Sequence, residues 1–415
     1  HVLLVVFLAH DHGQTIQQPV HARRSWRRGA PGARGARARC AGRFAGRGAP
    51  SGLLSWPRCC SFSRGRAAAT ERERCQLVAV GAHASAMELD APGDVVITDL
   101  SDAMSFGAEL VEPAVRDRSA NARAESPARG DELVLVIHGM NSHCRNPNVR
   151  ALAVGLAKRG ARALTFDLPG YGSCDGSFWD VRGQWGGAAK SLARIRRVLS
   201  HPAVRGEAFA IVGSSMGGAL AIFAANELMD AGEHDITRVV LVNPLMRMKT
   251  RFPAAVLLGL FILSRVPVLD KLEVSARPSD RKDGDKDMDF DEAGQAQCDA
   301  DDTTWRGGVS LLSGVELYRL TRVNGDGDAT EVSVHRCALA RLMRRAPTTL
   351  LTGAMDDVIP PATSIGRFDA AIGAGGCAEG CARYGFDRAG HSLTLQSRRE
   401  VFFDLAAGSK PPEEE

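Results

Sequence analysis

The sequence lacks any apolar run of the 18 or more residues that a membrane-spanning helix needs. Its ten cysteines include no C-x2-C pair with matching His or Cys spacing, which argues against a structural zinc site. They are also too sparse for a small disulfide-built secreted domain, so a reducing compartment is favoured. The 44 glycines follow no G-X-Y period, which excludes a collagen. With 44% hydrophobic and 24% charged residues, the chain has ordinary globular composition, and a wholly disordered protein is excluded.

Acidic residues are absent from His12 to Thr70, whereas arginine recurs from Arg23 to Arg66. This stretch produces the formal net charge of +4, so the charge gives no support for nucleic-acid binding by the folded part. Residues 21–66 have the composition of an organelle transit peptide, and a leader that precedes a start at Met87 is the alternative. We therefore expect residues 1–86 to lie outside the fold. The protein itself is expected in the cytoplasm or at a membrane surface, unless this segment directs it to an organelle.

Short β-branched runs alternate with helical stretches after the leader, a pattern typical of α/β proteins. The repeated alternation predicts a doubly wound, mostly parallel sheet with right-handed crossovers. We expect its core in residues 87–245 and 346–407, followed by an acidic tail over 408–415. The predicted strands are Asp94–Thr98, Glu132–Ile137, Arg162–Phe166, Ala208–Val212, Arg238–Val242, Thr348–Leu351 and Ala382–Phe386. The predicted helices are Asn148–Lys158, Gln184–Ser200, Met216–Met229 and a closing helix around Ser397–Ala406.

Residues 246–345 interrupt the alternation and predict an inserted helical cap, or lid. The segment opens with an apolar helix over Phe252–Ser264, continues into an acidic linker over 280–302, and ends with two more helical stretches. The linker contains Asp283, Asp285 and Asp287 in a D-x-D-x-D pattern, but the glycine and glutamate that a calcium loop requires are missing. We expect no metal there and interpret the linker as solvated.

The strongest chemical motif is Gly213-Ser214-Ser215-Met216-Gly217, which follows a predicted strand and opens a predicted helix. A G-x-S-x-G string alone is a weak signal, but this setting is what an exposed nucleophile on a tight turn needs. The positions two before and two after the nucleophile must lack side chains, and Gly213 and Gly217 satisfy this for Ser215. Ser214 is the poorer choice, because its equivalent neighbours are Val212 and Met216.

A serine hydroxyl needs a base and an orienting acid to act as a nucleophile at neutral pH. In folds of this kind the chain order is serine, acid, histidine. His391 follows the last predicted strand, whereas His234 lies at a helix end and His335 in the predicted cap. The acid is Asp356 or Asp357, both after the strand Thr348–Leu351, with Asp356 favoured by its spacing from the turn at Gly353.

Two backbone N–H groups are expected to form an oxyanion hole. One belongs to Met216, directly after the serine. The other belongs to Met140, in the loop after the strand Glu132–Ile137, where Gly139 allows a close turn. His138 and His143 of the same loop are interpreted as packing residues.

Together these motifs resemble the α/β-hydrolase superfamily, and more closely its monoacylglycerol lipase and serine aminopeptidase S33-type branch. The matching elements span residues 130–407 and include the loop at His138-Gly139, the segment 167–176 (DLPGYGSCDG), the serine motif, Gly353 with Asp356, and Gly390 with His391. The resemblance implies hydrolysis of lipid esters without a cofactor or metal. It also implies an apolar cap helix that rests on a membrane and lines the acyl site, with Val256, Leu257, Leu260 and Phe261 as the substrate-binding residues.

Other functions use the same residues. An aminopeptidase would need an acidic cluster for a free N-terminus, an acyltransferase would exclude water, and a non-catalytic binding protein of this fold would typically lack a member of the serine–histidine–acid set. Dehalogenase chemistry is excluded, because its nucleophile is a carboxylate. The acyl chain length, the alcohol and the oligomeric state are not encoded in these motifs.

Overall fold

A computed structural model describes residues 94–114, 132–174, 180–248, 252–275, 288–324, 337–373 and 376–409. The predicted leader, most of the acidic tail and the D-x-D-x-D pattern lie outside these residues. His335 is outside them too.

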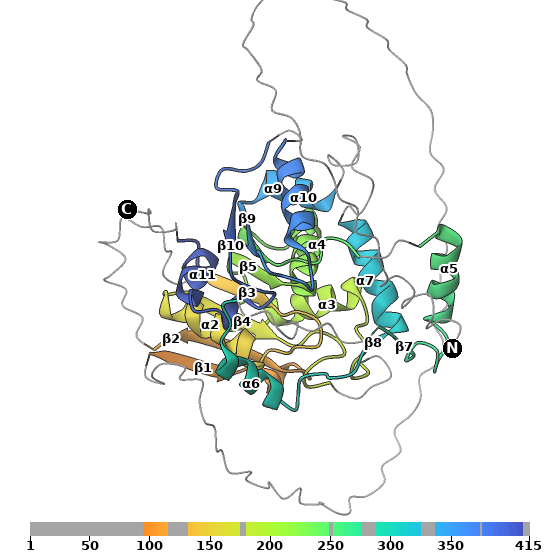
Figure 1. The fold of residues 1–415 in the computed structure, drawn as a ribbon. Coiled ribbons are helices and arrows are strands. Elements are labelled where there is room, and N and C mark those ends of the chain that lie inside the picture. Colours follow the sequence, from red (N-terminus) through yellow and green to blue (C-terminus); the bar gives the residue numbers. More distant parts are fainter. Residues whose placement is uncertain are drawn as a thin grey trace, which may run out of the picture. The chain divides into compact units, whose positions relative to one another are not determined.

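One eight-stranded sheet organises the described part of the chain, in the order β1-β2-β4-β3-β5-β6-β9-β10 (Figure 1). Its strands are parallel from β4 to β10, whereas β2 pairs antiparallel with both β1 and β4. The predicted doubly wound, mostly parallel sheet is thereby confirmed. The strands are β1 Val95–Asp99, β2 Ala108–Pro113, β3 Leu133–Ile137, β4 Arg162–Phe166, β5 Phe209–Ser214, β6 Ile236–Val242, β9 Thr348–Gly353 and β10 Ala382–Phe386.

Helices cover both faces of the sheet, and the strands alternate their side chains between them. In β3, Leu133 and Leu135 pack into one hydrophobic cluster, while Val134 and Val136 pack into the other. The first cluster includes residues of α3 Ala188–Leu199, α4 Met216–Ala231, α9 Ala338–Arg345 and α10 Pro361–Gly373. The second includes residues of α2 Pro147–Lys158 and α11 Arg399–Ala406. The continuous apolar runs of the central strands are thus explained by burial on both faces.

Sequence patterns miss or misplace three elements. Strand β2 was not predicted, because its acidic residues interrupt the apolar pattern that indicates a core strand. One of them, Glu109, is buried and pairs with two arginines, Arg145 and Arg150. Helix α10 is missed as well. The helix predicted from residue 184 begins only at Ala188, because Gly187 has a φ of 95° that no helix accommodates.

The 246–345 segment, called the insertion below, contributes no strand to the large sheet within its described residues. It contains α5 Ala254–Leu263, β7 Glu273–Ser275, α6 Glu292–Ala300, β8 Val309–Ser310 and α7 Leu311–Val323, and β7 pairs with β8 in a separate two-stranded sheet. Helix α9, which the sequence placed at its end, packs instead against α4 and α10 beside the large sheet.

The interpretation of 280–302 as a solvated linker is wrong for the described residues 288–302. Residues 292–300 form helix α6, which contacts α2 and the short 3-10 helix η3 Leu393–Leu395. Asp289 accepts hydrogen bonds from the backbone and hydroxyl of Ser397, and Asp291 pairs with Arg399. Local composition suggested solvent exposure, but partners distant in the sequence hold these acids against the fold.

Candidate active site

Ser215 lies at the sharp turn between β5 and α4. Its backbone has φ 57° and ψ −119°, a combination that costs energy for a residue with a side chain. The turn is held on the neighbouring strand, because the Ser215 N–H donates to the Val242 carbonyl at 2.9 Å and the Ser215 carbonyl accepts from Leu245 N–H at 2.9 Å. The half-buried Ser215 side chain is thus presented at the carboxyl edge of the sheet.

The two motif glycines allow this turn to pack closely. A Cβ atom at Gly213 would lie 2.3 Å from the Gly217 carbonyl oxygen, and one at Gly217 would lie 2.2 Å from the Ile137 carbonyl oxygen. Neither position has space for a side chain. The motif requires glycine at these two positions because the backbones of β3, β5 and α4 pack too closely there for a side chain.

Asp356 and His391 meet across the loops that follow β9 and β10. The Asp356 carboxylate accepts a hydrogen bond from His391 Nδ1 at 2.8 Å, and its other oxygen accepts from Ile359 N–H at 2.8 Å. The Asp356 side chain is fully buried, whereas 12% of the His391 side chain is exposed. A buried carboxylate at Nδ1 fixes the ring orientation and leaves Nε2 to exchange a proton. Of the two adjacent acids, the geometry favours Asp356.

Asn243, which the sequence analysis missed, joins these two loops. It follows β6 directly, has a φ of 41°, and donates from its amide to the His391 carbonyl at 2.7 Å. Its amide oxygen accepts from Gly353 N–H at 2.9 Å. A polar residue directly after a core strand was the available signal, but its two partners lie more than 100 residues away.

The loop after β3 approaches the serine from the other side. A Cβ atom at Gly139 would lie 3.2 Å from Ser215 Cβ, so this backbone passes directly beside the serine. Met140 and Met216 both line the cavity that contains Ser215. Met216 is the first residue of α4, so its N–H has no acceptor within the helix. Both predicted oxyanion donors therefore lie at the site.

The two histidines of that loop, His138 and His143, form hydrogen bonds that hold the loop in place. His138 Nε2 accepts from Leu168 N–H at 3.0 Å, and Nδ1 donates to the Gly139 carbonyl at 2.7 Å. Burial lowers the pKa of His138 to about 4, so its ring is neutral at physiological pH. His143 pairs with Asp301 of the insertion at 2.6 Å.

A cavity of about 680 Å³ contains Ser215 and His391. This volume is in the usual range for a small-molecule site. Part of its lining comes from α5, α7 and the β7–β8 pair, with apolar side chains such as Leu260, Val315 and Leu317. Another part comes from α2, α6 and η3, which contact one another.

Only two of the four predicted substrate-binding residues line this cavity. Leu257 and Leu260 do so, whereas Val256 and Phe261 are not among the lining residues. Val256 is 44% exposed, and the Phe261 ring lies under the guanidinium groups of Arg265 and Arg319. The helix is apolar on all sides, so its sequence could not indicate which side faces the cavity.

The family model described as serine aminopeptidase, S33, matches residues 128–395. The chain belongs to this family. This S33-family chain is therefore an α/β hydrolase, as the motifs implied. No curated protein matches it significantly.

Comparison with solved structures finds lipases and a thioesterase that are similar to this S33-family hydrolase at low sequence identity. A soluble variant of monoglyceride lipase from Saccharomyces cerevisiae, in complex with a substrate analog, is 16% identical, with a TM-score of 0.50 over 73% of this chain and 90% of that chain. The monoacylglycerol lipase of Paleococcus ferrophilus is 19% identical, with a TM-score of 0.48 over 67% of this chain and 95% of that one. The thioesterase domain from the curacin biosynthetic pathway is 18% identical, with a TM-score of 0.46 over 76% and 99%. At such identities a shared fold leaves the substrate open.

The described residues contain no group of three or more His, Cys, Asp or Glu side chains arranged to hold a metal ion. No helix within them is long and apolar enough to cross a membrane.

Proposed function

We propose that this S33-family hydrolase cleaves carboxylic esters, of the monoacylglycerol type or other lipid esters, through an acyl-serine intermediate on Ser215. The observation that carries the proposal is the strained Ser215 turn in the same cavity as the Asp356-bound His391. The insertion acts as a cap in this proposal, since residues of α5 and α7 line that cavity.

In the first half of the reaction, His391 Nε2 accepts the Ser215 hydroxyl proton while Oγ attacks the ester carbonyl. Asp356 stabilises the imidazolium through its hydrogen bond to Nδ1. The developing oxyanion accepts from the N–H groups of Met140 and Met216. Collapse of this intermediate breaks the ester bond, and the leaving alcohol takes the proton from His391.

In the second half, His391 removes a proton from water, which attacks the acyl-Ser215 carbonyl. The same amides hold the second oxyanion, and the proton returns to Ser215 as the carboxylic acid leaves. If an alcohol replaces water, the same steps produce an acyl transfer.

The charge distribution favours esters over peptides. An aminopeptidase needs acids near the scissile bond to bind a free N-terminus, but Asp357 is the single acidic residue among the described residues that line the cavity. Two described acids of the insertion pair with residues outside the cavity lining: Asp291 with Arg399, and Asp301 with His143. The apolar lining beneath α5 and α7 suits an acyl chain.

Labelling with a fluorophosphonate probe tests the nucleophile. The full-length protein should be labelled, Ser215→Ala should not, and His391→Ala should react far more slowly. Ser214→Ala is the matched control, because it changes the neighbouring hydroxyl and should still be labelled. Absence of labelling in folded wild-type protein would refute the assignment and favour a binding role.

A panel of monoacylglycerols of increasing chain length, run beside an aminoacyl amide series, tests the substrate class. We expect turnover of the esters and none of the amides. Added glycerol distinguishes a transferase, which would form a new ester in place of free acid. Turnover of the amides alone would establish the aminopeptidase alternative.

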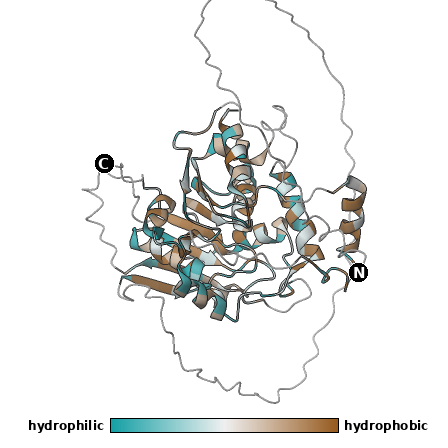
Figure 2. Cartoon of the chain, viewed as in Figure 1, coloured by the Kyte–Doolittle hydropathy of each residue, from teal (hydrophilic) through white to brown (hydrophobic). Residues whose placement is uncertain are grey.

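We also propose that α5 contacts a lipid surface. Its outer residues Leu258 and Ile262 are 61% and 57% exposed, and Val266, Val268 and Leu272 beyond it are exposed as well. Figure 2 shows α5 as predominantly hydrophobic. Ten helical residues extend about 15 Å, half the hydrocarbon core of a bilayer, so the helix can lie on a membrane without crossing it.

Flotation with phosphatidylcholine–phosphatidylserine vesicles tests this contact. Leu258→Glu and Ile262→Glu together should reduce the vesicle-bound fraction and leave hydrolysis of a soluble short-chain ester unchanged. A double variant that floats as well as wild type would refute the proposal.

A further inference from the structure

The insertion makes a direct polar contact with the loop that carries Met140. His143 of this loop donates from Nε2 to the Asp301 carboxylate at 2.6 Å, and the two side chains are only 4% and 14% exposed. The residues are 158 positions apart in the chain. Such a short, shielded bond to a carboxylate is stronger than a neutral hydrogen bond at the surface.

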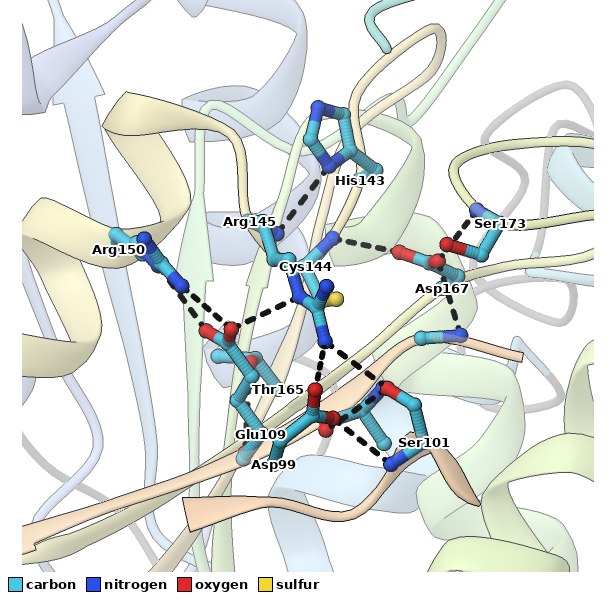
Figure 3. A network of polar contacts seen from close by, with 12 residues as sticks. Asp99, Ser101, Glu109, His143, Cys144, Arg145, Arg150, Thr165, Asp167 and Ser173 are labelled. Carbon is cyan, nitrogen blue, oxygen red and sulfur yellow. Dashed lines mark hydrogen bonds and ion pairs between the residues drawn. The ribbon is translucent and has the colours of Figure 1, made fainter. Parts of the chain in front are cut away.

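The backbone fixes which nitrogen of His143 carries the proton. Arg145 N–H donates to His143 Nδ1 at 3.3 Å, a contact marked in Figure 3. Nδ1 is therefore an acceptor, and the ring proton is on Nε2, where it points to Asp301.

Asp301 is held in place by its own surroundings. The same carboxylate oxygen accepts from the Thr304 hydroxyl at 2.9 Å, and the other oxygen accepts from Thr303 N–H at 3.0 Å. Asn146, at the start of α2, donates to Thr304 at 2.9 Å. Although burial opposes the charge, His143 and these hydrogen bonds hold the pKa of Asp301 below its usual value, so the carboxylate is ionised at neutral pH.

A second contact lies closer to Met140. Trp305 N–H donates to the Asn141 carbonyl at 3.0 Å. Asn141 is buried and has a φ of 67°, an unusual conformation for a residue other than glycine. The peptide unit of Met140 therefore lies between Gly139, packed beside Ser215, and a residue whose carbonyl is held by the insertion.

We propose that Asp301 is a positioning residue for the oxyanion hole: through His143 and the adjacent Trp305 amide, the insertion holds the 139–143 loop so that Met140 N–H points at the reacting carbonyl. This inference rests on the proposed serine hydrolase function. Other supports of the loop come from the sheet layer, where Cys144 N–H donates to Asp167 at 2.8 Å and Arg145 pairs with Glu109 at 2.9 Å (Figure 3).

Loss of the contact between Asp301 and His143 should affect the chemical step more than substrate binding. The oxyanion forms only during the reaction, so a displaced donor lowers kcat and has little influence on KM. Removal of a whole donor lowers kcat by about 100-fold or more, so partial displacement should lower it by about 10-fold to 100-fold.

The test measures kcat and KM of the full-length protein on a soluble ester. The kcat values are calculated per active site, and the concentration of active sites is measured by complete reaction with a fluorophosphonate. Asp301→Ala should lower kcat about 10-fold to 100-fold and change KM by less than about 3-fold. Asp302→Ala is the matched control: an adjacent acid whose side chain is exposed, it should behave as wild type. His143→Ala should resemble Asp301→Ala, and the double variant should be no slower than the slower single variant.

Asp301→Asn covers the case in which Asp301→Ala does not fold. It keeps the side-chain volume but cannot accept from both His143 and Thr303, so kcat should still fall several-fold. A kcat within 2-fold of wild type in the folded Asp301 variants, or independent effects of the two single substitutions, would overturn the inference while the hydrolase assignment stands. A wild-type protein that neither labels nor turns over esters would overturn both.

Discussion

Substitution of Gly217 by alanine tests whether the serine turn depends on backbone packing. A Cβ atom there would lie 2.2 Å from the Ile137 carbonyl oxygen and 2.5 Å from that of His138. Both are backbone atoms in or directly after β3, and they cannot rotate away as a side chain would. The helix α4 must therefore move away from β3.

The magnitude follows from this overlap. Overpacking costs about 1–3 kcal/mol, and the upper half of that range applies where backbone must shift. For a domain of this size each kcal/mol lowers the melting temperature by about 2–4 °C, so a decrease of roughly 4–12 °C is expected. The same shift separates the Met216 amide from the loop at Gly139, so ester hydrolysis should fall at least about 10-fold.

Differential scanning calorimetry and ester turnover are the assays, and Gly366→Ala is the matched control. Gly366 is exposed in α10 and has open space around its Cα, so the same substitution should stabilise the protein by up to about 1 kcal/mol. If Gly217→Ala melted like Gly366→Ala and kept full activity, the packing argument for the motif glycines would be wrong.

Three further predictions concern single side chains. Asp356→Asn should lower kcat by about 10⁴-fold with the fold intact, whereas Asp357→Asn should change it less than about 10-fold; equal losses in steady-state kinetics would contradict the assigned acid. Because burial lowers the pKa of His138 from 6.5 to about 4, the unfolded state binds the extra proton between these pH values. The free energy of unfolding should therefore decrease by up to about 3 kcal/mol as pH falls through this window, and urea titrations at pH 7 and pH 4.5 should show a smaller decrease in His138→Gln. Burial, with Asp167 nearby, raises the pKa of the Cys144 thiol, so iodoacetamide at pH 8 should leave Cys144 unmodified in peptide maps until the protein is unfolded; rapid native labelling would be the opposite result.

Local pattern was sufficient for the central sheet and the serine turn. The runs that became β3 and β5 are continuous and apolar, because both faces of these strands are covered. The serine motif is short, so strand, turn and helix all lie within one stretch of chain. The chain order of serine, acid and histidine then narrowed the partners to Asp356 or Asp357 and His391.

The sequence pattern could not predict elements whose stability depends on partners that are distant in the chain. Strand β2 carries the buried Glu109, which is tolerated because Arg145 and Arg150 lie against it. The acidic stretch of the insertion looks solvated from its sequence, because His143 and Ser397, which bind its Asp301 and Asp289, lie 158 and 108 positions away in the chain.

By itself the sequence determined the fold class and predicted the nucleophile motif and its histidine partner, because these depend on hydrophobic period, turn chemistry and chain order. The tertiary structure alone decided that Asp356 holds His391, that Asn243 joins their loops, and which side of α5 faces the cavity. It also brought Asp301 of the insertion to His143 beside the serine. The physical reason is the same in each case: a hydrogen bond or a buried face is specified by three-dimensional proximity, which composition and spacing along the chain do not contain.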